Sequence, residues 1–261
     1  MHDNCCTEKM RATAPLNGHF ESFTGENKET VKMIKIFGKV TDFSGNPIEN
    51  AEIDINNKYF EIIYQTFSGE DGKYSLSVNE GMYIAMFVCK NYKKENLEYW
   101  AWNIPAYSDL EINPRIDDLE VYAMNAWVPQ GAVPSVQIYF RPMSLKRATP
   151  ILSLNNWPDT HDIVKIAPEL VKLQNVVDIA PELSEDDIYL KIDNELMNVL
   201  EINKVRESAG KDQSIFGYLI QSNLPMHKTG QDYHKICLTI RDAETKEQGE
   251  ACLFWKEPQY V

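Results

Sequence analysis

The sequence is short of positive charge. It has 26 lysine and arginine residues against 39 aspartate and glutamate residues, which gives a formal net charge of −13 at pH 7. A surface this acidic repels phosphate backbones and anionic membranes. The densest basic runs, Lys93-Lys94 and Lys146-Arg147, are too short to form a compensating patch. We therefore expect no nucleic-acid partner and no binding to a membrane surface.

Long apolar segments are also absent. No stretch is long and apolar enough to span a bilayer, and the first ten residues contain no hydrophobic region of the kind found in signal peptides. The five cysteines are an odd number, and a chain of 261 residues does not need disulfides to hold its fold. The sequence therefore predicts a cytoplasmic protein in which Cys89, Cys237 and Cys252 are reduced, mostly buried strand residues.

Motifs that carry catalysis or hold metals are missing as well. The sequence has no Gly-x-Ser-x-Gly turn, no glycine-rich phosphate loop, no Cys-x-x-Cys and no histidine pair at helical metal spacing. It therefore predicts no cofactor, no metal and no nucleophilic centre. One enzymatic alternative stays open, namely a small hydrolase, lyase or isomerase with its site between two domains and with His227, Asp232 and His234 in that site.

What the sequence does contain is a series of short segments in which apolar and polar residues alternate, separated by turn signals. The alternation is clear in residues 34–40, 51–55 and 74–78, and it returns in residues 188–192 and 233–241. A period of two is typical of half-buried strands. Because no strand–helix–strand alternation appears, the pattern predicts an all-β protein built from antiparallel β-sandwiches.

A stretch punctuated by prolines divides the chain. Within it, Ile166-Ala-Pro-Glu-Leu170 recurs as Ile179-Ala-Pro-Glu-Leu183, and proline followed by glutamate suits the first turn of a short helix. We therefore predict two antiparallel sandwich domains joined by a linker with short helical turns, docked on the first domain through Ile151, Leu152 and Trp157. The predicted units are a polar N-terminal arm at 1–30, a first sandwich at 31–150, the linker at 151–186 and a second sandwich at 187–261.

Turn signals in the first half support a known architecture. Gly45-Asn46-Pro47 predicts a tight turn between strands, and Asp71-Gly72 predicts a hairpin. The full pattern is Gly38-x-Val40-x-Asp42, Gly45-x-Pro47-Ile48-x-x-Ala51-x-Ile53-x-Ile55, Asp71-Gly72-x-Tyr74-x-Leu76 and Gly81-x-Tyr83. With these motifs, residues 36–92 resemble the carboxypeptidase regulatory-like, transthyretin-like domain. The resemblance implies a β-sandwich and supplies no catalytic residues.

The second half carries a shorter set of motifs. The run from Tyr233 to Asp242, together with Gly249-Glu-Ala251, resembles a bacterial immunoglobulin-like module. This resemblance implies a compact immunoglobulin-like sandwich, again without catalytic residues.

Aromatic residues gather in the middle of the chain. Trp100 and Trp102 point to the same face of a strand, and Tyr107, Trp127 and Arg141 follow. Two indoles on one face would form a platform on which sugar rings stack, with nearby polar groups binding the hydroxyls. Aromatic residues in sandwiches also form cores or cover the seam between domains, and they form patches that bind protein partners. These alternatives stay open at the level of sequence.

From these patterns we expect a non-catalytic binding or accessory module that recognises carbohydrate or a protein partner through an aromatic surface, with Trp100, Trp102, Tyr107, Trp127 and Arg141 as its contacts. An oligomeric structural protein is a further alternative, because sandwiches with open edge strands associate edge to edge. Under that alternative we expect a homo-oligomer.

Overall fold

The computed structural model describes residues 32–131, 133–153, 178–210, 213–225 and 232–256. Nearly all of the regular structure is β-strand, which confirms the all-β prediction. None of the helices in these ranges is long and apolar enough to cross a membrane. The first strands are β1 (Met33–Lys39), β2 (Glu52–Asn56), β3 (Ile62–Phe67), β4 (Lys73–Asn79), β5 (Gly81–Cys89), β6 (Tyr99–Ala106), β7 (Leu110–Glu111), β8 (Leu119–Trp127) and β9 (Val136–Ser144). They are followed by α1 (Leu145–Ser153), the 3₁₀ turn η2 (Glu185–Asp187), β10 (Ile188–Ile192), β11 (Glu195–Met197), β12 (Val199–Gly210), β13 (Gln213–Ser222), β14 (His234–Arg241) and β15 (Gln248–Trp255).

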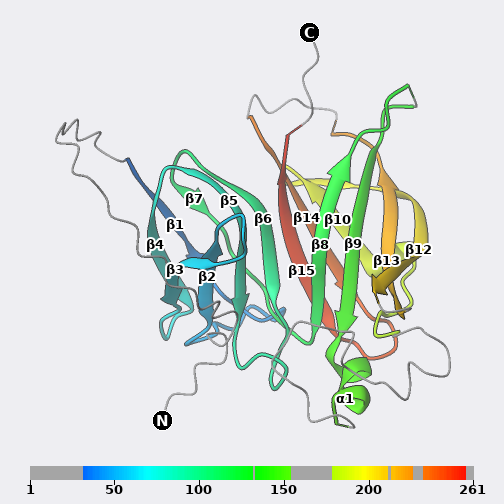
Figure 1. Ribbon diagram of the computed structural model, residues 1–261, viewed down its shortest axis with the longest axis horizontal. Coiled ribbons are helices and arrows are strands. Elements are labelled where there is room, and N and C mark those ends of the chain that lie inside the picture. Colours follow the sequence, from blue (N-terminus) through cyan, green and yellow to red (C-terminus); the bar gives the residue numbers. More distant parts are fainter. Residues whose placement is uncertain (1–31, 132, 154–177, 211–212, 226–231, 257–261) are drawn as a thin grey trace, which may run out of the picture.

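The strands form three sheets. A central sheet has eight strands in the order β11-β10-β14-β15-β6-β5-β2-β3, and it is accompanied by a three-stranded sheet, β4-β1-β7, and a four-stranded sheet, β12-β13-β9-β8. Most neighbouring strands are antiparallel, whereas β15 pairs with β6 and β1 pairs with β7 in parallel. In Figure 1, β1 to β7 lie at the left and β8 to β15 at the right, and β6 and β15 join the two halves.

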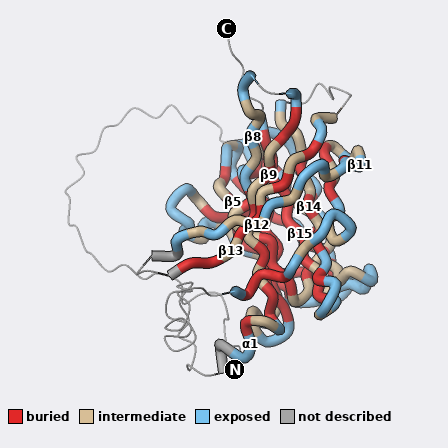
Figure 2. Tube along the Cα trace, turned by 90° about the vertical axis from the view of Figure 1, so that its right-hand side faces the viewer, coloured by how far each residue is buried: buried red, intermediate tan, exposed pale blue. Residues whose placement is uncertain are grey.

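The central sheet carries a hydrophobic core on each face. Because successive side chains of a strand point to opposite faces, Trp100 and Trp102 of β6 enter one core, while Tyr99 and Ala101 enter the other. The first core lies under the four-stranded sheet and the second under the three-stranded sheet. Figure 2 shows buried residues along the packed strands and exposed residues mainly at the loops. Two sandwiches therefore share one sheet, and β5 and β6 contribute to both.

Strands β8 and β9 pair with the second half of the chain. Tyr139 lies opposite Leu219, and Val136 lies opposite Ser222, in an antiparallel β9–β13 ladder. Residues 119–144, which we expected within a first sandwich at 31–150, thus share a sheet with strands β12 and β13. The alternation in a strand determines which side chains share a face, but it does not determine which other strand pairs with it.

The tight turn predicted at Gly45 forms as expected. The N–H of Gly45 donates to the carbonyl oxygen of Asp42 at 3.1 Å, and Gly45 has a φ of 87°. Asp193 and Asn194, both with positive φ, form the two-residue turn between β10 and β11. Such two-residue turns match the twist of a hairpin.

The hairpin predicted at Asp71-Gly72 is wrong. Gly72 does turn the chain, with a φ of 77°. However, β3 pairs with β2 in the central sheet, whereas β4 pairs with β1 in the three-stranded sheet. The turn therefore joins two facing sheets, a connection that the same turn residues allow.

The described end of the linker, residues 178–186, packs on the sandwich that contains the four-stranded sheet. Ile179 and Ala180 are buried, and the hydroxyl of Tyr218 on β13 donates to the carbonyl oxygen of Pro181 at 2.8 Å. Residues 178–184 contain no helix, and the short 3₁₀ turn η2, which begins inside the linker predicted at 151–186, directly follows the second Ile-Ala-Pro-Glu-Leu copy. The first copy, the N-terminal arm at 1–30 and Trp157 lie outside the described residues, as do the side chains of Ile151 and Leu152.

The prediction that Cys237 and Cys252 are reduced is wrong. They lie directly opposite each other on β14 and β15 and form a disulfide, with their Cα atoms 4.3 Å apart. Cys89 is buried, as expected. Counting cysteines could not reveal the bond, because it depends on the register of two neighbouring strands.

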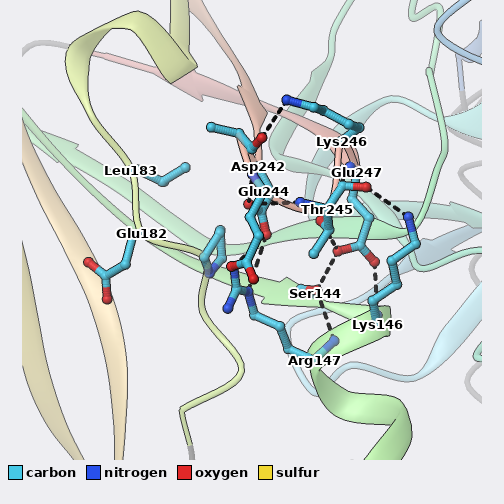
Figure 3. A network of polar contacts seen from close by, with 12 residues as sticks. Ser144, Lys146, Arg147, Glu182, Leu183, Asp242, Glu244, Thr245, Lys246 and Glu247 are labelled. Carbon is cyan, nitrogen blue, oxygen red and sulfur yellow. Dashed lines mark hydrogen bonds and ion pairs between the residues drawn. The ribbon is translucent and has the colours of Figure 1, made fainter.

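Helix α1 is held to the turn between β14 and β15 by two buried carboxylates (Figure 3). Asp242 accepts hydrogen bonds from Nε and Nη2 of Arg147, at 3.2 and 2.9 Å. Glu247 accepts hydrogen bonds from the hydroxyl of Ser144 and from the backbone N–H of Lys146. A buried carboxylate is stable only when it is paired and hydrogen-bonded, so these contacts fix the position at which the chain leaves the sandwich.

Replacing Arg147 by alanine is expected to lower the free energy of unfolding by roughly 1.5–3 kcal/mol at neutral pH, because the carboxylate of Asp242 loses a charged donor. Burial alone would raise the pKa of Asp242, but hydrogen bonds from the backbone N–H of Glu244 and from Arg147 outweigh it and hold the pKa below 3.8. A carboxyl group with a lowered pKa stabilises the fold above its unfolded pKa, and this contribution is lost as the pH falls through the folded-state pKa. Urea unfolding of both proteins over a pH series measures the difference. The difference in unfolding free energy should shrink as the pH falls below the ordinary pKa of an aspartate, and a difference that is constant with pH would contradict this role.

Candidate functional site

The two tryptophans predicted to form a ligand platform are buried. Trp100 is 5% exposed and Trp102 is 8% exposed. Their rings are stacked, with centroids 5.0 Å apart and an interplanar angle of 11°, and Tyr122 packs its ring against both edge-on. Nε1 of Trp100 donates to Glu120 at 2.9 Å. The indoles share a face as predicted, but the four-stranded sheet covers that face, so they form no exposed platform.

The other three predicted contact residues do not join the tryptophans in a common surface. Tyr107 is 47% exposed after the end of β6, and Trp127 is 43% exposed at the end of β8. Arg141 is half-buried on β9, where its Nε donates to Glu207 at 3.0 Å and its guanidinium lies 5.8 Å from the ring centroid of Tyr122. A role in binding for the exposed Tyr107 and Trp127 stays a prediction.

The histidine cluster of the enzymatic alternative is not assembled in the described residues. Nδ1 of His234 lies 2.6 Å from the carboxylate of Asp193, and the ring centroids of His234 and Trp255 are 5.7 Å apart. Asp232 is exposed, and His227 lies outside the described residues. In the part of the chain that the structure describes, no three His, Cys, Asp or Glu side chains are grouped so that they could hold a metal ion.

A polar groove lies where the two sandwiches meet. The three-stranded sheet ends at β7, so the outer face of β10, β14 and β15 continues beyond it without a covering sheet. The resulting cavity has a volume of about 630 Å³. We call it the junction groove; its walls and floor include Lys39, Glu111, Arg115, Tyr189, Lys191 and Glu250.

The floor of the junction groove is a network of three polar side chains from three segments. Arg115, just after β7, donates from Nε to Glu250 of β15 at 3.0 Å and from Nη2 to the hydroxyl of Thr239 on β14 at 2.9 Å. The Thr239 hydroxyl in turn donates to Glu250 at 3.0 Å. Glu250 is buried, and the guanidinium of Arg115 also packs on the ring of Phe43 at 4.6 Å. These contacts preorganise a guanidinium and a carboxylate side by side.

The sides of the junction groove offer one aromatic ring and several further polar groups. Tyr189 of β10 is 46% exposed, with Nζ of Lys191 lying 5.2 Å from its ring centroid. Asn194 and Asn113 add amide groups that both donate and accept. Lys235 is not part of this lining but shares a face of β14 with Thr239; burial lowers its pKa, although Glu250 and Glu111 oppose this shift. Such a combination of fixed donors, fixed acceptors and a ring suits a ligand that carries several hydroxyl groups.

Sequence reasoning did not find the junction groove. Arg115 and Glu250 are 135 residues apart, and each alone resembles an ordinary surface charge. The one available signal was the polar side of the strand at 233–241, where Lys235 and Thr239 alternate with isoleucine and leucine. That pattern marks an uncovered face without showing what lies opposite it.

No family model matches this sequence, and no curated protein matches it either. Among solved structures, a DUF3823 family protein from Bacteroides ovatus aligns with 10% identity and a TM-score of 0.26 over 86% of this chain and all of that chain. A suggested carbohydrate binding protein from Bacteroides uniformis aligns with 8% identity and a TM-score of 0.27, over 85% of this chain and 98% of that chain. The major pilin subunit BcpA of Bacillus cereus aligns with 10% identity and a TM-score of 0.26, over 85% of this chain and 69% of that chain. At these TM-scores we infer nothing about function from them, and the resemblance of residues 36–92 to the carboxypeptidase regulatory-like domain stays a prediction.

Proposed function

We propose that this protein is a non-catalytic binding module that recognises a carbohydrate in the junction groove. The observation that carries the proposal is the preorganised group of Arg115, Glu250 and Thr239 on the floor of a cavity of about 630 Å³. A sugar hydroxyl both donates and accepts hydrogen bonds, so adjacent hydroxyls match a guanidinium and a carboxylate that are held side by side.

The size of the junction groove favours a short saccharide over a protein partner. Cavities of roughly 300–1,000 Å³ are typical of small-molecule sites. Stable protein interfaces instead bury roughly 1,200–2,000 Å² and are centred on apolar anchors. The junction groove is lined mainly by charged and amide side chains, with Tyr189 as its exposed ring. A protein partner and a homo-oligomer stay predictions for the rest of the surface.

Replacing Glu250 by glutamine is expected to weaken carbohydrate binding by about ten-fold, because one charged acceptor is lost while the shape of the side chain is kept. Binding is measured first on a glycan array and then by calorimetry with the best glycan. Tyr107→Ala and Trp127→Ala are the matched controls, since both residues are exposed and lie outside the junction groove. The melting temperature of each variant shows whether the fold is intact.

Two results would count against this assignment. Unchanged affinity in a folded Glu250→Gln variant would remove the junction groove as the site. A loss of affinity in Trp127→Ala or Tyr107→Ala alone would move the site to the aromatic residues predicted from the sequence.

A further inference from the structure

The junction groove has a small excess of positive charge, although the protein as a whole is acidic. The chain as a whole has a formal net charge of −13. The groove nevertheless has three cationic side chains, Lys39, Arg115 and Lys191, against two carboxylates, Glu111 and Glu250. Local charge of one sign inside a concave site raises the local concentration of ions of the opposite sign.

The two carboxylates of the junction groove already have donors within the protein. Glu250 accepts hydrogen bonds from Arg115 and Thr239, and Glu111 accepts one from the side-chain amide of Asn113 at 3.0 Å. The charge of Arg115 is therefore largely balanced by Glu250.

The two lysines, in contrast, make no ion pair with any residue that the structure describes. Lys39 comes from the end of β1 and Lys191 from β10, so they approach the groove from different strands. Nζ of Lys191 lies 5.2 Å from the ring centroid of Tyr189, and an aromatic ring attracts a cation without neutralising it. Within the described part of the chain, the groove thus keeps two lysine charges without an ion pair, against the one carboxylate, Glu111, whose donor there is a neutral amide.

A third lysine strengthens this arrangement. Lys235 is not among the residues that line the groove, but it points to the same face of β14 as Thr239, because residues four apart in a strand share a face. Burial lowers its pKa, so its charged form would be stabilised by an added anion.

We propose that the carbohydrate bound in the junction groove contains an acidic sugar, of the uronic or sialic acid class, whose carboxylate is bound by Lys39 and Lys191. The inference rests on the proposed function and names its ligand class. A single carboxylate needs only local cations, whereas a long polyanion would also meet the repulsion of the acidic surface. Short acidic oligosaccharides therefore fit better than nucleic acids or extended polyanions.

The test compares acidic glycans with uncharged counterparts of the same shape. The probes are trigalacturonic acid and its methyl ester, and sialyllactose and lactose, each measured by calorimetry with the full-length protein. At least one acidic probe should bind about ten-fold more tightly than its uncharged counterpart, and the difference should decrease as NaCl is added. Lys191→Gln should remove most of this difference and Lys191→Arg should retain it.

Lys58→Gln is the matched charge control, since Lys58 is exposed, lies outside the junction groove and carries the same charge. An equal loss in Lys58→Gln and Lys191→Gln would overturn the inference, because it would show a general charge effect. Equal affinity for acidic and uncharged probes, or binding to uncharged probes alone, would also overturn it while leaving the proposed function intact. Binding to no member of a broad glycan array would overturn the proposed function itself.

Discussion

Replacing Trp102 by alanine is expected to lower the free energy of unfolding by roughly 3–5 kcal/mol, the cost of removing a large buried aromatic side chain. Trp102 is 8% exposed, stacks on Trp100 at 5.0 Å and contacts the edge of Tyr122 at 5.5 Å. Its removal would leave a cavity between the central sheet and the four-stranded sheet. Because two sandwiches share the central sheet, the loss should appear as one cooperative shift in a urea unfolding curve.

Trp102→Phe is the informative control. Nε1 of Trp102 is buried and has no hydrogen-bond partner among the described residues. Phenylalanine keeps much of the apolar contact and removes an unpaired polar group, so we expect a loss well below that of the alanine variant. Nearly unchanged stability in Trp102→Ala, together with abolished carbohydrate binding, would contradict the core role of Trp102. That result would support the hypothesis of an exposed aromatic platform.

Removing the disulfide between Cys237 and Cys252 is expected to lower the free energy of unfolding by about 3 kcal/mol, the value of the loop-entropy model for a loop of this length. The two residues are 15 positions apart, and the bond fastens β14 to β15 near the middle of the central sheet. Strand β15 also carries the parallel pairing to β6 that joins the two halves. The Cys237→Ser/Cys252→Ser double variant is compared with the wild type by urea unfolding, with and without reductant.

Reduced wild type and the double variant should have similar stabilities, both below that of the oxidised wild type. Identical stability with and without reductant would contradict the bond, as would alkylation of both cysteines in denatured, non-reduced protein. Disulfides persist mainly in oxidising compartments. The expected cytoplasmic location stays a prediction, and this bond weighs against it.

The sequence was sufficient to predict the strands in which the alternation is clear. The period of two in residues 34–40 and 188–192 corresponds to β1 and β10, and the turn predicted at Gly45 forms where glycine allows positive φ. These features are local, so a single chain segment is enough to reveal them.

The sequence was not sufficient to predict which strands pair or which faces are covered. Alternation placed Trp100 and Trp102 on one face correctly, but only the four-stranded sheet, built partly from residues 199–222, decides that this face is buried. Because strand pairing could not be predicted, the junction groove could not be predicted either: the parallel β15–β6 pairing brings Glu250 next to Arg115. Contacts across such sequence distances leave no periodic signal in the chain.

The most direct test of the site assignment is a two-dimensional NMR titration of the labelled protein with the tightest glycan from the array. The assignment to the junction groove predicts that the largest shift changes fall on the backbone amides of Lys191, Thr239 and Glu250. Shift changes confined to the surroundings of Tyr107 or Trp127, with these three amides unmoved, would contradict it.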